Sequence, residues 1–112
     1  MPNQRRLNKV NELIHRFISG LLRRELDVEA LVTISSVVTS ANGQEATVSI
    51  TVFPFEKSEA VLKEIQKNIY EFQQALNRGL RMRPVPKIIF KIDESEERGD
   101  KILQKIDYLD SN

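Results

Sequence analysis

A strict alternation of apolar and polar residues over positions 45–53 restricts the fold of this chain more than any other feature. Apolar side chains occupy every second position of the segment: Ala46, Val48, Ile50 and Val52. A period of two places them on one face of a β-strand and the intervening Thr and Ser residues on the other. The pair Asn42-Gly43 precedes this strand, and residues 31–40 before it are rich in Val, Ile, Thr and Ser. Because Asn-Gly suits a turn that needs positive φ, we predict an antiparallel hairpin with one buried face.

Two segments with helical periodicity flank this hairpin. Residues 5–26 and 58–80 carry apolar side chains three and four positions apart, a spacing that lines one face of an α-helix. The stripe of the first helix consists of Val10, Leu13, Ile14, Phe17, Ile18, Leu21 and Leu22. We expect Pro54 to end the second strand, Ser58 to be the N-cap of the second long helix and Gly79 to stop it. Residues 87–93 predict a third strand.

The order helix, strand, strand, helix, strand predicts an α+β fold. In this fold both helices pack on one face of a three-stranded sheet, and Thr, Ser and Lys side chains keep the other face polar. A chain of 112 residues has the size of one domain. We expect residues 1–106 to form that domain, with a short helix around residues 102–106, and residues 107–112 to be a separate, mobile acidic tail.

Composition argues against several functions. The chain has no Cys and a single His, His15, so it offers no disulfide, no thiolate and no plausible metal site. No Ser has an adjacent base, and isolated Gly residues form no phosphate cradle. No apolar run is long enough to cross a membrane, and the N-terminus does not read as a secretory signal. We therefore expect a cytoplasmic protein that is no enzyme and uses no cofactor, small-molecule substrate or membrane.

The net charge of +1 conceals an uneven distribution. Residues 1–24 carry six basic groups against one acid, and residues 78–91 carry five with no acid, whereas residues 25–64 and 93–112 are acidic. On the first helix Arg5, Lys9, Arg16 and Arg23 fall on one line opposite the apolar stripe. Such a basic ridge is typical of phosphate contacts, although an exposed helix face solvated by Arg and Lys produces the same pattern.

Residues 80–102 also carry a recognisable motif. A basic and apolar alternation leads into Val85-Pro86, then an apolar strand with Phe90, then Asp93-Glu94-Ser95 and, a few residues on, Gly99. This segment resembles the signature of the ribosome-binding factor A family, and the order of elements matches that family's KH-like (type II) arrangement. Members interrupt the long helix with an Ala-x-Gly kink in place of the Gly-x-x-Gly loop of KH domains; here residues 68–70, Asn-Ile-Tyr, stand at that position.

The resemblance implies a non-catalytic assembly factor in ribosome biogenesis. Such a protein binds the immature small (30S) ribosomal subunit and its rRNA, assists late maturation and 5′-end processing of 16S rRNA, and often matters in cold adaptation; we expect it to act as a monomer. The residues expected to contact RNA are Arg5, Lys9, Arg16, Arg23, Arg78, Arg81, Arg83 and Lys87. Tyr70 is a candidate for stacking on a base, and a packed or half-exposed surface tyrosine is an equally good explanation.

Two other functions fit the same sequence. The protein could be an interaction module that meets a protein partner through the polar sheet face or the acidic tail. It could also be a ribosome hibernation factor, which would share the ribosomal partner but bind mature subunits in resting cells. The sequence alone does not separate these alternatives.

Overall fold

The structure is a computed structural model that describes residues 3–95. The predicted helix around residues 102–106, the acidic tail 107–112 and the domain boundary at residue 106 lie outside the described residues. The same holds for the part of the signature beyond Ser95. Among the described residues, no helix is both long and apolar enough to cross a membrane.

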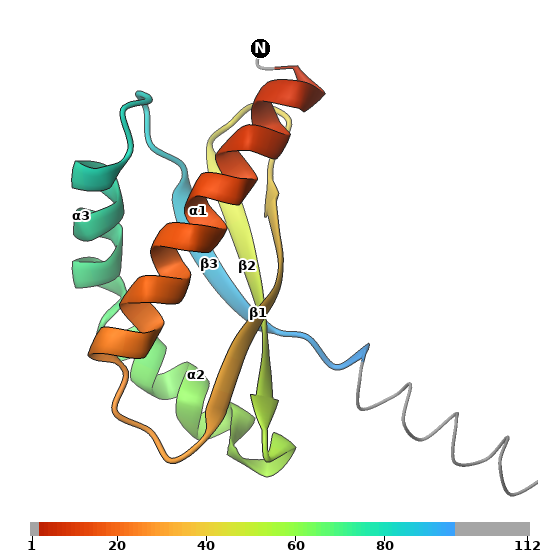
Figure 1. The fold of residues 1–112 in the computed structure, drawn as a ribbon, viewed down its shortest axis with the longest axis vertical. Coiled ribbons are helices and arrows are strands. Elements are labelled where there is room, and N and C mark those ends of the chain that lie inside the picture. Colours follow the sequence, from red (N-terminus) through yellow and green to blue (C-terminus); the bar gives the residue numbers. More distant parts are fainter. Residues whose placement is uncertain (1–2, 96–112) are drawn as a thin grey trace, which may run out of the picture.

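Three helices cover one face of a three-stranded sheet (Figure 1). The elements are α1 (Gln4–Glu25), β1 (Leu31–Thr39), β2 (Glu45–Phe53), a 3₁₀ turn η1 (Phe55–Lys57), α2 (Ser58–Lys67), α3 (Ile69–Gly79) and β3 (Lys87–Ile92). The predicted α+β class and element order are confirmed, with one difference: the second long helix is divided in two. Helix α1 begins at a side-chain cap, since the Asn3 carboxamide oxygen accepts a hydrogen bond from the Arg6 N–H (2.9 Å).

The sheet has the order β1-β2-β3 and mixed strand directions. The predicted antiparallel hairpin of β1 and β2 is confirmed, with Ile34 opposite Ile50 and a bulge at Ser35. Its turn needs positive φ only at Gly43 (φ 74°). Strand β3 pairs with β2 in parallel, with Ala46 opposite Ile88. A parallel pair needs a long crossover connection, and α2 and α3 supply it.

The core lies between the helices and the inner face of the sheet. The buried apolar residues are those that the two periodicities predict, with Ile14, Ile18, Val48, Ile50, Ile65 and Leu76 completely shielded. Phe72 of α3 meets Phe90 of β3 edge to face, with ring centroids 6.3 Å apart. Leu13 is the exception in the first stripe: it is 43% exposed, because a residue next to Ile14 is rotated by about 100° from the line that faces the sheet.

The outer face of the sheet is less polar than predicted. It does carry Thr33, Thr51 and Lys91, but Leu31 and Phe53 lie directly opposite each other on it and are 67% and 74% exposed. Further along the same face, the exposed residues Val38 and Ile89 flank Thr47 in one row across the three strands. The expectation of a polar face was therefore wrong at these four positions. Alternation along a strand determines which face a residue lies on, but it does not determine whether that residue is polar.

Two predictions about helix ends also need correction. Ser58 is not an N-cap: η1 runs directly into α2, so Ser58 already has helical backbone angles (φ −56°, ψ −45°), and Lys57 occupies the cap position. The Ser58 hydroxyl is buried without a hydrogen-bond partner among the residues that the structure describes. Gly79 does end α3, but not through positive φ. It allows close packing instead, since a Cβ at Gly79 would overlap the ring of Phe17 on α1.

Candidate nucleic-acid interface

The predicted basic ridge is an exposed line along the outer surface of α1. Arg5, Lys9, Arg16 and Arg23 are all exposed, and the buried residues of α1 lie on the opposite side, against the sheet. A helix of 22 residues is about 33 Å long, so the ridge offers charge over several phosphate spacings. Thr39 of β1 contacts the helix through its hydroxyl: Thr39 Oγ1 donates a hydrogen bond to Asn11 Oδ1 of α1 (2.6 Å). This bond holds α1 over β1.

An open groove of about 650 Å³ runs between α1 and the outer strand β1. Its lining residues are Asn11, Glu12, His15, Arg16, Ser19, Arg23 and Val37. Two residues of the predicted ridge therefore border a groove and do not project from a flat surface. His15 is exposed in this groove and not packed against the core. The groove combines two guanidinium groups with hydrogen-bonding side chains, a chemistry suited to a phosphate and sugar backbone.

Most of the second basic segment lies in the connection from α3 to the first residue of β3, residues 80–87. Gln73 of α3 fixes its end: the side-chain Nε2 donates to the Pro86 carbonyl (3.0 Å), and Oε1 accepts from the Ile88 N–H (2.9 Å). The Lys87 N–H donates to the Gln44 carbonyl (2.9 Å), which joins the connection to the hairpin turn. Sequence reasoning missed Gln73, because its partners lie 13 and 15 positions away and no local pattern marks it.

The predicted residues of this connection differ in what they can offer to RNA. Arg81 and Lys87 are exposed. Arg83 uses one guanidinium nitrogen, Nη1, to donate to the carbonyls of Leu80 (2.8 Å) and Met82 (2.7 Å). Part of the Arg83 side chain therefore holds the shape of the connection, and a phosphate would meet only the remainder of its donors.

The fold brings part of the predicted set together. The N-terminal part of α1, with Arg5 and Lys9, the hairpin turn and the connection 80–87 lie at the same end of the molecule (Figure 1). Arg78, near the end of α3, also borders a groove of about 550 Å³ between α1 and α3, whose lining includes Arg24, Glu25 and Glu71. We call the first group, with residues 5, 9, 81, 83 and 87, the basic end.

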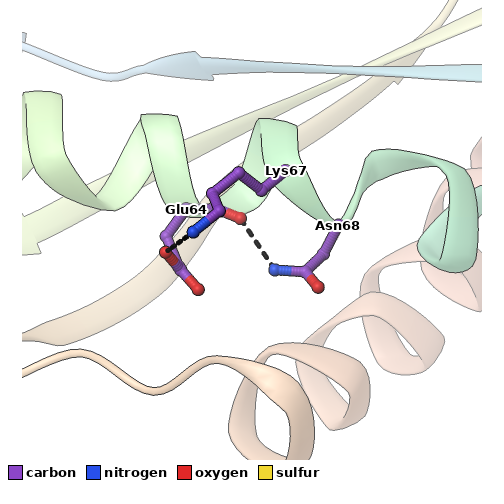
Figure 2. Close-up of polar contacts among 3 residues, drawn as sticks. All are labelled: Glu64, Lys67 and Asn68. Atoms are coloured by element: carbon purple, nitrogen blue, oxygen red, sulfur yellow. Dashed lines mark hydrogen bonds and ion pairs between the residues drawn. The ribbon is translucent and has the colours of Figure 1, made fainter.

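The junction of α2 and α3 shows how this chain interrupts its second helix. Asn68 has non-helical backbone angles (φ −104°, ψ 8°), and its N–H donates to the Ile65 carbonyl (3.0 Å), three residues back. The carbonyl of Glu64, four residues back, receives the Asn68 side-chain Nδ2 instead (2.8 Å). Figure 2 shows this reach of the Asn68 amide toward Glu64, whose carboxylate also lies 3.8 Å from the Lys67 ammonium.

Asn68 thus interrupts the helix at the position where the resemblance predicts a kink. Asparagine suits this position because its short amide competes with the backbone for hydrogen bonds. Helix α3 restarts at once, with the Phe72 N–H donating to the Asn68 carbonyl (3.0 Å). Tyr70, two residues beyond the break, is 69% exposed, so its ring is on the surface and not packed in the core.

The Asp-Glu-Ser segment of the signature has a structural role in the described part of the chain. The Asp93 carboxylate accepts hydrogen bonds from the Ser95 N–H (2.9 Å) and the Ser95 hydroxyl (2.6 Å). Hydrogen bonds from Ser35 and from Ser95 lower the pKa of Asp93 from 3.8 to about 2. Ser35 is the residue at the bulge of β1. Within residues 3–95 no group of three His, Cys, Asp or Glu side chains could hold a metal ion.

The fold and the basic surfaces together define a small α+β domain of the KH-like class. The family model for ribosome-binding factor A matches residues 6–106. Curated relatives named ribosome-binding factor A include proteins of Prochlorococcus marinus strain NATL1A (35% identity over 98% of this chain and 94% of the relative) and Geobacter metallireducens (33% over 96% and 93%). The chain therefore belongs to the ribosome-binding factor A family.

Solved structures support the fold. The crystal structure of ribosome-binding factor A from Thermus thermophilus superposes with a TM-score of 0.69 at 22% identity, covering 77% of this chain and 94% of that one. A homology model of the Thermus thermophilus factor, fitted into a cryo-electron microscopy map of its complex with the 30S subunit, gives a TM-score of 0.59 at 21% identity over 79% and 91% of the two chains.

Proposed function

We propose that this protein binds the immature small ribosomal subunit through its rRNA and assists the late maturation of that subunit in the cytoplasm, including 5′-end processing of 16S rRNA. Family membership supports this proposal, and a relative with this fold has been fitted into a 30S complex. The observation that carries it is the basic end, where α1 and the connection 80–87 present exposed Arg and Lys side chains together. The proposed role is to hold an rRNA element by its phosphates, without catalysis and as a monomer.

If the basic end contacts phosphates, its affinity for RNA should depend on the salt concentration. Each Lys or Arg that neutralises a phosphate releases counterions, so affinity falls as the salt concentration rises. Arg81 and Lys87 are the best residues for the test because both are exposed, whereas reversing Arg83 would also disturb the bonds that it donates to Leu80 and Met82.

The double variant Arg81→Glu, Lys87→Glu should bind precursor small subunits at least about tenfold more weakly, and the slope of log affinity against log salt should fall by about two. Lys63→Glu with Lys67→Glu, on α2, makes the same change of net charge away from the basic end and is the matched control. Co-sedimentation of purified precursor subunits over a salt series measures both quantities. Unchanged binding of the Arg81, Lys87 variant would contradict the site.

The role in maturation needs a separate measurement. Gradient profiles and 16S rRNA 5′-end mapping from cells with and without the protein should show precursor subunits with unprocessed 5′ ends accumulating in its absence, more strongly in the cold. Association with mature subunits in resting cells only would favour the hibernation alternative. Association that survives nuclease treatment and depends on one protein alone would favour the interaction module.

A further inference from the structure

Two exposed apolar residues lie side by side on the outer face of the sheet, at the opposite end of the molecule from the basic end. Leu31 and Phe53 are direct cross-strand partners in β1 and β2, and they are 67% and 74% exposed. Their neighbours in the next row of this face are Thr33 and Thr51. Single exposed apolar residues are common. An exposed aromatic with an exposed leucine directly opposite it is a compact anchor point, and no described residue covers it.

Acidic side chains lie on the segments that lead into and out of this pair. The linker 26–30 precedes Leu31, while η1 and the start of α2 follow Phe53, and both segments meet at one end of the molecule (Figure 1). The exposed carboxylates on them are Asp27, Glu29, Glu56 and Glu59. Lys57, 4.0 Å from Glu29, is the basic residue that opposes them. We call this group, with Leu31 and Phe53, the acidic–apolar corner.

Charge decides which occupant suits this corner. RNA phosphates would be repelled by the carboxylates, so Phe53 is badly placed to stack on a base. Two copies that met corner to corner would bring carboxylates together, and a head-to-tail pair would occupy the basic end, which is assigned to rRNA. Residues 96–112 of the same chain contain five acidic groups against three basic ones, so their own net charge also opposes docking. A basic protein segment with an apolar side chain satisfies both features: its apolar group covers the pair, and its Lys or Arg residues face the carboxylates.

We propose that the acidic–apolar corner docks a Lys- and Arg-rich segment of a protein of the small ribosomal subunit. This inference rests on the proposed function, since it assumes that the basic end has already engaged that particle. The two surfaces would then act together: the basic end binds RNA and the corner binds an adjacent protein. Aromatic anchors near the centre of an interface contribute most of its affinity, so Phe53 is the residue whose loss matters most.

Photo-cross-linking tests the occupant directly. The full chain carries a photo-reactive phenylalanine analogue in place of Phe53 and is irradiated on purified precursor small subunits, and the adduct is mapped by mass spectrometry. The same analogue at Tyr70, which is equally exposed but lies at the α2–α3 break, is the matched control. The expected result is a protein adduct within a Lys- and Arg-rich segment from position 53, and a different adduct from position 70.

The alternatives overturn the inference in distinguishable ways. An adduct with rRNA, with a second copy or with residues 96–112, or no adduct from a chain that still co-sediments, removes the inference and leaves the proposed function intact. Loss of co-sedimentation of the unmodified protein removes both.

A variant gives an independent reading. Phe53→Ser with Leu31→Ser should weaken subunit binding about tenfold. Val38→Ser, which removes an exposed apolar side chain from the same sheet face but outside the corner, should leave binding unchanged. Circular dichroism confirms that the exposed double variant is folded. Binding equal to that of the unchanged protein would contradict the proposal.

Discussion

The basic end and the acidic–apolar corner are built in different ways, although both lie on one small domain. The basic end combines residues from α1 and from the connection 80–87, which are more than 70 positions apart in the sequence. Its geometry depends on how α1, α3 and β3 pack. The corner is local: Leu31 and Phe53 belong to one hairpin, and its carboxylates lie on the adjoining segments. A change in helix packing should therefore alter the basic end and leave the corner in place.

Gly79→Ala should produce the largest such effect. The new methyl group would overlap the Phe17 ring, and overpacking of this kind costs about 1–3 kcal/mol of unfolding free energy. Relief of the overlap would also move α1 relative to α3, and hence Arg5 and Lys9 relative to Arg81. Urea unfolding and RNA binding measure the two consequences.

Gly20→Ala is the control for this change. A Cβ at Gly20 would approach only the end of the Arg24 side chain, at 3.3 Å, and that side chain can move. Replacement of a helical glycine by alanine should stabilise the protein by about 0.5–1 kcal/mol. Equal effects of the two substitutions would show that the contact between Phe17 and Gly79 does not limit the packing.

Gln73→Ala should have a smaller and more selective effect. It removes the acceptor of the Ile88 N–H and the donor to the Pro86 carbonyl. An unsatisfied backbone group costs about 1–3 kcal/mol, and we expect the lower part of this range because both bonds are only partly buried. Faster amide hydrogen exchange at Ile88, with unchanged exchange in the β1–β2 hairpin, would confirm that only the basic end loosens. Gln66→Ala, on the exposed side of α2, should change neither.

The smallest effect concerns Asp93 at the end of β3. Its pKa is lowered from 3.8 to about 2 in the folded protein. The folded protein therefore favours the ionised carboxylate more than the unfolded chain does. Its contribution to stability is present above about pH 4 and is lost as the pH falls from about 4 toward 2. Asp93→Asn should reduce that part of the acid sensitivity. A thermal unfolding series from about pH 6 to about pH 2 that is identical for both proteins would contradict the assignment.

Some residues of the candidate site were predictable from the sequence and others were not. The ridge on α1 was predictable because four residues on one helix share a face through helical periodicity alone. Arg83 was predicted as an RNA contact on the same footing as Arg81, yet its bonds to Leu80 and Met82 commit one of its nitrogens. Arg78 was grouped with the connection, and only the structure shows that it also borders the α1–α3 groove. These distinctions depend on the direction of a side chain, which composition and spacing do not encode.

The sequence by itself determined the elements that arise from local periodicity and turn chemistry: α1, the hairpin with its turn at Gly43, the third strand and most of the core. Only the tertiary structure decided features that depend on contacts between distant residues. These include the parallel pairing of β3 with β2, the overlap that makes Gly79 necessary, the Gln73 bonds and the exposure of Leu31 and Phe53. The physical reason is that a periodic pattern specifies which face of an element is apolar, whereas packing alone specifies which part of that face is covered.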